Sequence, residues 1–120
     1  MPTEFLIDDA FVEKSTGVIT LNFKDEDGQP KDPETAKWTL TDDLGNVINS
    51  RENVVIASPT SEENIVLSGL DLALSDGFAG NAEWRVLLVQ ATYDSTFGSD
   101  LPLNDFVRFP VRNAVAITNT

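Results

Sequence analysis

The sequence AEWRVLLVQATY, residues 82–93, predicts the central β-strand of this protein. Its apolar residues fall into two alternating series, Trp84, Val86 and Leu88 in one and Leu87, Val89, Ala91 and Tyr93 in the other. Successive side chains of a strand point to opposite faces, so this strand is apolar on both faces over part of its length. A strand of this kind lies inside a sheet and is covered on both sides.

Other stretches alternate with the same period of two, which is typical of strands. Ile19, Leu21 and Phe23 alternate with polar residues, and so do Ala36, Trp38 and Leu40. Shorter β-branched or aliphatic runs follow at 54–56 and 65–67, with a hairpin turn at 42–46 before them. We expect residues 70–74 to cross between sheets as a turn and residues 94–104 to form a loop. A last strand over 106–111 contains Pro110, which predicts a sheet edge or a bulge there.

About seven strands separated by turn residues are typical of an all-β sandwich. Trp38 and Trp84 are in register with inward-facing aliphatic residues, and we expect both in the core. Arg85, Arg108 and Arg112 are expected to pair with acidic residues on the surface. The sandwich domain is predicted over residues 17–120. Residues 1–16 are predicted to be an extra edge strand or an arm that packs on a neighbouring copy.

The composition excludes several classes of function. The 120 residues include 20 acidic and 8 basic side chains, which gives a net charge of −12. Nucleic acid and anionic membranes are not expected as partners, because contacts with phosphate need Lys or Arg. The chain has no Cys and no His, which excludes thiol chemistry and histidine-based proton transfer. No stretch reads as a signal peptide or a membrane span, and a cytoplasmic product is expected.

One cluster of acidic residues is a candidate site for a metal ion, and the metal that it suits is calcium. Asp25, Asp27 and Asp32 lie in a stretch that begins like a calcium-binding loop, since hard cations take several oxygen ligands. The closing Glu of that loop type is missing, so a solvated turn is the favoured interpretation. No carboxylate pair lies in an apolar run where burial would raise its pKa. We therefore expect no catalytic residues and no enzymatic activity.

Three aromatic residues in or beside predicted loops are the candidates for a contact surface. They are Phe78, Tyr93 and Phe97.

The order Ile65-x-Leu67-x-x-Leu70, a Gly-containing corner and Trp84-x-Val86-x-Leu88 resembles the passage from strand E to strand F in fibronectin type III and related immunoglobulin-like domains. In immunoglobulin domains a Tyr near the start of strand F donates a hydrogen bond back to the preceding backbone. Here the corner is longer, and Trp84 stands where Tyr is usual. The resemblance implies an immunoglobulin-like β-sandwich of about seven antiparallel strands.

Four further phrases resemble small proteins encoded among the structural genes of tailed bacteriophages and prophages. They are FKDEDG at 23–28, WTLTD at 38–42, GNVINSR at 45–51 and VLSG at 66–69. The similarity covers residues 18–113 and implies a virion-associated domain at the head surface, the head-to-tail junction or the tail. Such a protein is made in the host cytoplasm and then carried in the virion. The resemblance assigns no site residue.

The predicted function is that of a non-enzymatic phage structural or assembly protein that acts through protein–protein contacts. Its expected partners are other virion proteins or further copies of itself. One alternative is an immunoglobulin-like module that binds carbohydrate or a cell surface through exposed aromatic residues. A second alternative is an acidic hydrolase with a carboxylate pair, which requires a cleft that holds a carboxylate of raised pKa.

Overall fold

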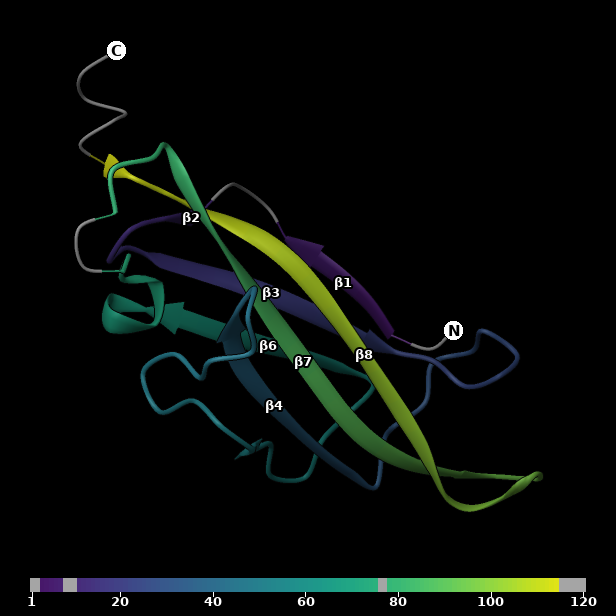
Figure 1. The fold of residues 1–120 in the computed structure, drawn as a ribbon. Helices are drawn as coiled ribbons and strands as arrows, with labels where there is room; N and C mark the ends of the chain where they lie inside the picture. The colour runs from purple at the N-terminus through teal and green to yellow at the C-terminus, as the bar shows by residue number, and fades with distance from the viewer. Residues whose placement is uncertain (1–2, 8–10, 76–77, 115–120) are drawn as a thin grey trace.

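The computed structural model describes residues 3–7, 11–75 and 78–114 of the chain (Figure 1). Its elements are β1 (Thr3–Ile7), β2 (Phe11–Val12), β3 (Thr16–Phe23), β4 (Thr35–Asp42), β5 (Val54–Val55), β6 (Glu62–Ser68), the 3-10 helix η1 (Gly69–Leu72), β7 (Ala82–Ser95) and β8 (Gly98–Arg112). Within these ranges no helix has the length and apolarity that a membrane span requires. The prediction of an all-β protein is confirmed.

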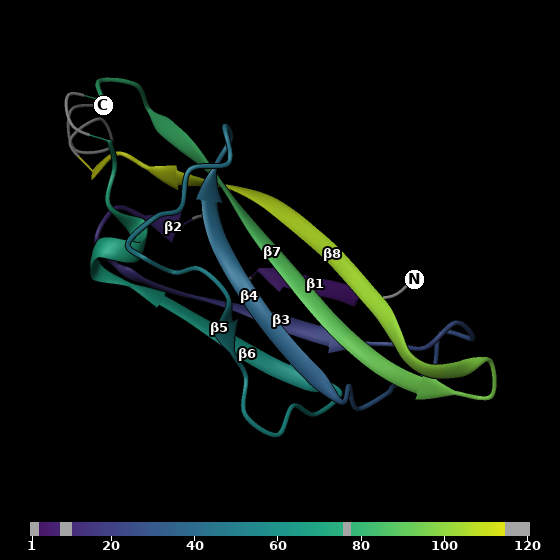
Figure 2. The ribbon, with the colours of Figure 1, turned by 60° about the horizontal axis from the view of Figure 1, so that its bottom comes forward.

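The described strands form two sheets. One has the order β1-β3-β6 and the other the order β2-β8-β7-β4-β5. Neighbours pair antiparallel except β2 and β8, which pair parallel. The larger sheet curls into a half-barrel, with β7 and β8 crossing in front of the smaller sheet (Figures 1 and 2). As predicted for a central strand, β7 has a partner on each side, but its second face is not covered as expected at Trp84, which is 40% exposed.

The core lies between the two sheets and comes from alternate residues of each strand. Ile19, Leu21 and Leu67 of the smaller sheet and Leu40, Leu87 and Val89 of the larger one are all fully buried. Their burial removes apolar surface from water, which is the main favourable contribution to folding. Trp38 is buried among them, as predicted.

The prediction that Trp84 is a core residue is wrong, since its side chain is 40% exposed. Both series of β7 are apolar, so the pattern of residues alone does not say which series faces inward. The inward series is that of Leu87, Val89, Ala91 and Tyr93, and Arg85 takes the next inward place. Trp84 belongs to the opposite series and lies on the outer face.

The prediction of a loop over 94–104 is also wrong. Strand β7 continues to Ser95 and β8 begins at Gly98, which makes one long hairpin with a register shift between Tyr93 and Ser95. Gly98 has a φ of 153°, which is available to glycine and strained for other residues. The Gly, Asp and Pro residues that suggest a loop therefore serve a tight turn and the strand edge beside it.

Both proline residues of β8 lie where no described residue pairs with the side of the strand away from β7. Pro102 pairs with Thr92 and Pro110 with Trp84, while β2 reaches only Val111 and Arg112 on the other side. A proline has no N–H to donate, so it is tolerated where a strand lacks a neighbour. The edge position predicted for Pro110 is confirmed.

The remaining sequence predictions concern the crossing turn and the N-terminal stretch. The turn expected over 70–74 is present as η1, which leads from β6 of the smaller sheet toward β7 of the larger one. At the N-terminus, β1 pairs with β3 at the edge of the smaller sheet. Residues 1–2 and 8–10 lie outside the described ranges.

Asp71 is the buried carboxylate of this crossing turn, with 1% of its surface exposed. Its Oδ1 accepts hydrogen bonds from Arg51 Nε at 2.7 Å and Asn49 Nδ2 at 2.9 Å, and its Oδ2 accepts one from Ser68 N at 3.1 Å. Burial by itself raises the pKa of Asp71, but these hydrogen bonds outweigh it and hold the pKa below its ordinary value. The carboxylate thereby ties the loop after β4 to the turn between the sheets.

Replacing Asp71 tests this tie. We expect Asp71→Asn to lower the free energy of unfolding at pH 7 by about 2 kcal/mol, because charged hydrogen bonds are lost from a buried site. A lowered folded-state pKa stabilises the protein above the unfolded pKa, and this stabilisation is lost as the pH falls through the folded value. The difference between wild type and variant should therefore shrink below about pH 4. Urea unfolding from pH 7 to pH 2 measures it, and a difference independent of pH would contradict the assignment.

Candidate interaction surface

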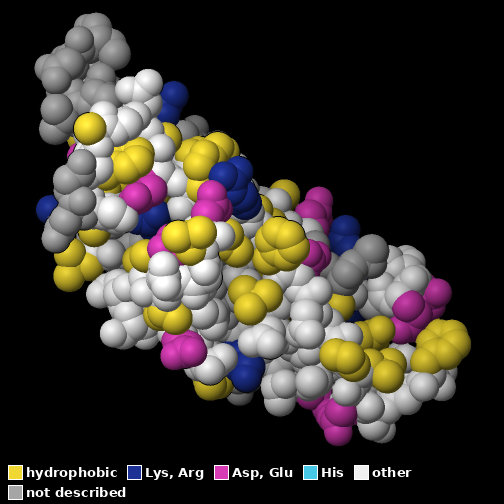
Figure 3. All heavy atoms as spheres, viewed as in Figure 1, with side chains coloured by type: hydrophobic (Ala, Val, Ile, Leu, Met, Phe, Trp, Pro, Cys, Tyr) yellow, Lys and Arg dark blue, Asp and Glu magenta, His cyan; other side chains and the backbone are white. Residues whose placement is uncertain are grey.

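The outer face of the five-stranded sheet carries exposed aromatic side chains. Cross-strand pairing places Trp84 beside Pro110, Val86 beside Arg108, and Leu88 beside Phe106. Phe106 is 62% exposed, and Trp84 is 40% exposed. We define the aromatic patch as the five residues Trp84, Val86, Leu88, Phe106 and Arg108. Figure 3 views the molecule with β7 and β8 in front and shows hydrophobic side chains gathered along this face.

Along residues 35–41, 84–92 and 102–110 of β4, β7 and β8, the outward-facing side chains include no acidic residue, although the chain has a net charge of −12. Asp43 reaches this face from the adjacent turn and bonds to Arg108, and Asp94 and Asp100 lie at its hairpin end. The outward-facing residues in these ranges are Thr35, Lys37, Thr39, Thr41, Trp84, Val86, Leu88, Gln90, Thr92, Pro102, Asn104, Phe106, Arg108 and Pro110. The two charged residues among them are both basic. By contrast, Glu4 and Glu62 flank Asn22 on the outer face of the smaller sheet. The larger sheet therefore offers a surface that another molecule can approach without repulsion between carboxylates.

Arg108 holds the ring of Trp84 in place. Its guanidinium carbon lies 4.0 Å from the centre of the Trp84 ring, within the range of a cation–π contact. The same guanidinium donates two hydrogen bonds to Asp43, from Nε to Oδ1 at 2.8 Å and from Nη2 to Oδ2 at 2.7 Å. The hydrogen bond from Arg108 lowers the pKa of Asp43. This surface pair is the kind expected for Arg108, and it keeps the patch ordered and nearly neutral.

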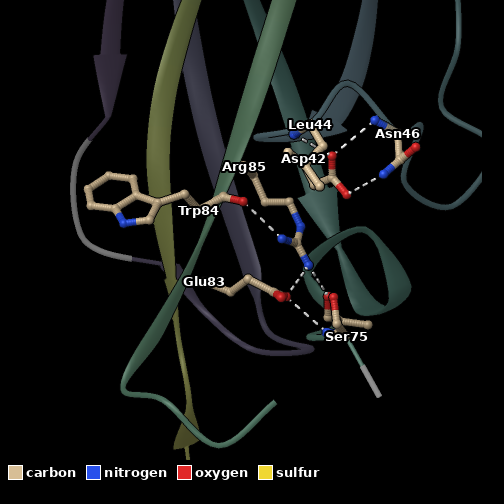
Figure 4. Close-up of polar contacts among 8 residues, drawn as sticks. Asp42, Leu44, Asn46, Ser75, Glu83, Trp84 and Arg85 are labelled. Atoms are coloured by element: carbon tan, nitrogen blue, oxygen red, sulfur yellow. Dashed lines mark hydrogen bonds and ion pairs between the residues drawn. The ribbon is translucent and has the colours of Figure 1, made fainter. Parts of the chain in front are cut away.

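A buried arginine lies directly beneath the patch. Trp84 and Arg85 point to opposite sides of β7 (Figure 4), and Arg85 is 1% exposed. Arg85 Nη1 donates to the carbonyl oxygen of Trp84 at 2.9 Å, and Nη2 donates to that of Ala73 at 2.9 Å and to Glu83 Oε1 at 2.6 Å. The surface position expected for Arg85 is therefore wrong. Its side chain joins the start of β7 to the segment that follows η1.

Glu83 completes this polar cluster. Its Oε1 also accepts a hydrogen bond from the backbone N–H of Ser75 at 2.9 Å (Figure 4). Burial raises the pKa of Glu83, but the bonds from Ser75 and Arg85 outweigh burial and lower it overall. Arg85 Nε has no hydrogen-bond partner within the described part of the chain. The cluster is thus held by the two terminal nitrogens of one guanidinium, and it is a structural joint rather than an open site.

Two carboxylates, those of Asp25 and Asp42, close turns. Asp42 Oδ1 accepts hydrogen bonds from Leu44 N at 2.8 Å and Asn46 N at 2.9 Å, and the bonds from Asn46 lead in lowering the pKa of Asp42 (Figure 4). This is the hairpin turn predicted at 42–46. Asp25 Oδ1 accepts from Asp27 N and Gln29 N in the same way. Short acidic side chains favour such turns because they bond to the backbone a few residues ahead.

The structure only partly assembles the predicted calcium ligands. Asp25 and Asp27 lie close to each other and to Glu26, whose carboxylate accepts a hydrogen bond from Tyr93 Oη at 2.7 Å. Asp32 does not join them and instead accepts a hydrogen bond from Ser61 N at 2.7 Å. The grouping of these acids agrees with the favoured interpretation of a turn.

A second carboxylate group was not predicted. Glu34, Asp94 and Asp100 bring their carboxylate oxygens within 4.8 Å of one another at the base of the β7–β8 turn. A hydrogen bond with Asp94 and repulsion from it are the largest causes of a raised pKa at Glu34. The three residues come from separate segments, so they become neighbours only when the hairpin and β4 pair.

The three predicted contact residues do not form one surface. Phe97 is 76% exposed in the turn between β7 and β8. Tyr93 is only 8% exposed and bonds to Glu26, and Phe78 is half-buried against Gly80. The residues of the aromatic patch were missed because β7 is apolar on both faces. The signal that could have found them is Arg108. An arginine that alternates with apolar residues along a strand marks the series of side chains that faces solvent, and Val86 lies opposite Arg108 in that series.

Replacing Arg85 tests its role as a joint. We expect Arg85→Ala to lower the free energy of unfolding by about 3 kcal/mol, because Glu83 and two carbonyl groups lose a buried partner. Arg112→Ala is the matched control, since Arg112 is exposed near the end of the same sheet, and it should change stability by less than about 0.5 kcal/mol. Chemical denaturation of both variants measures the difference. Equal losses of stability in the two variants would show that Arg85 contributes only its positive charge and not its buried hydrogen bonds.

Tryptophan fluorescence tests the orientation of β7. Trp84→Phe leaves Trp38, which is 7% exposed, and Trp38→Phe leaves Trp84. We expect the first variant to emit at shorter wavelength and to resist quenching by acrylamide, and the second to be quenched several times more strongly. Two equally protected tryptophans would mean that β7 presents its other face to the core.

The chain has no match among protein-family models, curated proteins or solved structures. What it does must therefore be inferred from the residues that it places on its surface.

Proposed function

We propose that this protein is a non-enzymatic binding domain that contacts another protein through the aromatic patch. The observation that carries the proposal is an exposed aromatic sheet face, whose neighbouring carboxylate Asp43 is paired with Arg108, on a chain with a net charge of −12. Aromatic residues and Arg are enriched at the centres of protein interfaces, where they supply most of the binding energy. Trp84, Phe106 and Arg108 are three such residues on two neighbouring strands.

The surroundings of the patch define the partner's chemistry. Arg108 is already neutralised by Asp43, so the centre of the patch presents apolar surface and no free charge. Outside this face the chain is strongly acidic. The best partner is therefore a protein surface with an apolar centre and a basic rim, whose charges meet the acidic surroundings of the patch.

The geometry favours a protein over a carbohydrate. A sugar ring stacks on an open aromatic face, but Arg108 occupies one face of Trp84 at 4.0 Å. Carboxylate chemistry is less favoured as well, because many acids are engaged in turns, with arginine side chains or with other donors such as Tyr93 Oη.

The strand order supports an immunoglobulin-like sandwich, which we propose as the finer description of the fold. In immunoglobulin-type domains strands A, B and E share one sheet and strands C, F and G the other. The sheets β1-β3-β6 and β4-β7-β8 follow this order. Arg85 donates to the carbonyl of Ala73 twelve residues upstream, a bond of the same kind as that of a corner tyrosine. The sequence resemblance to phage structural proteins adds the proposal that the partner is a virion protein.

Affinity capture with matched variants tests the proposed function. Wild type, Phe106→Glu, Trp84→Ala and Val66→Glu are immobilised and exposed to extracts of the source cells, with and without phage particles. Val66 is the control, because it is 55% exposed on the outer face of the other sheet. We expect proteins retained by wild type and Val66→Glu to be lost about tenfold or more from the two patch variants, as for hot-spot residues. Virion proteins should be prominent among them.

The binding of the most depleted protein is then measured with purified components. The proposal is overturned if all four chains retain the same proteins, or if the patch variants bind the purified partner as tightly as wild type does. Thermal unfolding of each variant establishes that the patch variants are folded.

A further inference from the structure

A groove of about 500 Å³ lies on the outer face of the five-stranded sheet, next to the aromatic patch. On β7, Leu88 of the patch is followed in the outward series by Gln90 of the groove. On β8, Phe106 of the patch is preceded in the same way by Asn104 of the groove. The surface of the groove is mainly apolar, and Val55 on one wall is 75% exposed. A protein that lies on the patch therefore reaches the groove as well.

A group of three carboxylates borders one end of this groove. Glu34, Asp94 and Asp100 hold oxygen atoms within 4.8 Å of one another, and we name them the acid triad. Glu34 directly precedes the groove residue Thr35, and Asp94 follows Thr92 in the outward series of β7. Over the described ranges, none of the three forms an ion pair with Lys or Arg. The acid triad is thus a concentration of negative charge that the described chain does not neutralise.

The crowding of the acid triad favours a cationic ligand. The pKa of Glu34 is raised, with a hydrogen bond with Asp94 and repulsion from it as the largest causes and Asp100 adding to both effects. The charged form of Glu34 is therefore destabilised by its neighbours. A cation that lies among the three carboxylates offsets this repulsion, and no cationic side chain of the described residues does so.

Three polar side chains line the groove farther from the acid triad, and we name them the polar row. They are Lys37, Gln90 and Asn104, which are neighbours because Gln90 pairs with Lys37 on one side and with Asn104 on the other. In the part of the chain that the structure describes, their side chains have no hydrogen-bond or ion-pair partner. An ammonium group and two amides can donate to the carbonyl oxygens of a peptide.

The spacing of the acid triad and the polar row fits one long basic residue. Lys37 is three positions from Glu34, which corresponds to about 10 Å along an extended chain. A long side chain that extends from the polar row can therefore place its end among the carboxylates. Its aliphatic part then covers the apolar surface of the groove, as the stems of long basic side chains commonly do.

We propose that the groove binds an arginine side chain of the protein that lies on the aromatic patch. The guanidinium donates to the acid triad, and the backbone carbonyl of the same arginine accepts from the polar row. Arginine is favoured over lysine because its guanidinium is a planar fork of N–H donors and is less strongly hydrated than an ammonium group. The inference rests on the proposed function for the identity of the partner, and it names the basic residue that this partner presents.

NMR of the isotope-labelled chain tests the site with N-acetyl-arginine methylamide as the probe, in EDTA so that divalent cations do not occupy the carboxylates. We expect saturable shifts of the backbone amides of Thr35, Thr92 and Asn104, with a Kd on the order of 1 mM. N-acetyl-citrulline methylamide, which has nearly the same shape without the charge, should bind about tenfold or more weakly. Methylguanidinium, which lacks most of the aliphatic chain and the backbone, should also bind about tenfold more weakly.

A matched pair of double variants tests the acid triad. Asp94→Asn combined with Asp100→Asn removes two charges and keeps an oxygen at position 94 that can accept from the backbone N–H of residue 100, as Asp94 Oδ1 does at 2.8 Å. We expect this variant to bind the arginine probe about tenfold or more weakly. Asp25→Asn combined with Asp27→Asn removes two charges from the other carboxylate group and should change the Kd by less than about twofold. The dispersion of the amide signals establishes that each variant is folded.

Four outcomes would overturn the proposal. They are the absence of saturable shifts at the groove, equal binding of the arginine and citrulline probes, equal binding by the two double variants, and a methylguanidinium Kd equal to that of the arginine probe. The last outcome would mean that the carboxylates attract any small cation and that the groove adds nothing.

The partner itself separates this inference from the proposed function. Trp84→Ala should bind the arginine probe as wild type does while it loses the captured protein. The variant with Asp94→Asn and Asp100→Asn should retain about tenfold less of that protein than wild type. If the patch variants lose the partner but the probe does not bind, only the arginine site is wrong. If the probe binds but all chains capture the same proteins, the proposed function fails and the arginine site remains.

Discussion

The burial of Arg85 between the two sheets determines which face of β7 is exposed. Its terminal nitrogens bond to Ala73, Trp84 and Glu83, and these bonds require that the side chain point inward. Because side chains alternate along a strand, Trp84, Val86 and Leu88 must then point outward. A guanidinium is costly to bury without partners, so the bonds of Arg85 act together with the burial of Leu87 and Val89 to set which face of β7 points inward. The aromatic patch lies on the other face of the same strand.

The open edge of β8 is protected in a way that leaves its face available. Pro102 and Pro110 have no N–H to offer, and the N–H of Phe106 donates to Asp105 Oδ1 at 2.8 Å. These residues remove donors from a side of β8 that β2 covers only at Val111 and Arg112. Natural sheets use such devices to avoid pairing with another chain edge to edge. Contacts between molecules are thereby directed to the face of the sheet.

The direction of a side chain could be predicted from the sequence where apolar and polar residues alternate along a strand, because only one face of that strand is then apolar. Ile19, Leu21 and Phe23 alternate with polar residues, so their inward direction follows from the pattern alone. Trp84 was misplaced because β7 is apolar in both series, and only the tertiary partners of Arg85 distinguish them. The loop expected over 94–104 is a hairpin, since turn-forming residues there serve the tight turn and the strand edge.

Residues that meet only in three dimensions were out of reach of the sequence. Glu34 lies 60 positions before Asp94, with β4, β5 and β6 between them, and no spacing rule connects Glu34 with Asp94 and Asp100. The carboxylates that were correctly assigned to turns, such as Asp42, act on backbone within four residues of themselves.

The long β7–β8 hairpin also has a consequence for how the chain is ordered. It pairs residues that are near in sequence, such as Val89 with Asp105, 16 positions apart, whereas the smaller sheet pairs Ile19 with Ile65, 46 positions apart. Closing a shorter loop costs less conformational entropy. The whole aromatic patch thus belongs to the part of the molecule with the most local contacts. The shape of this surface therefore depends less than the core does on pairing between segments that are far apart in the sequence.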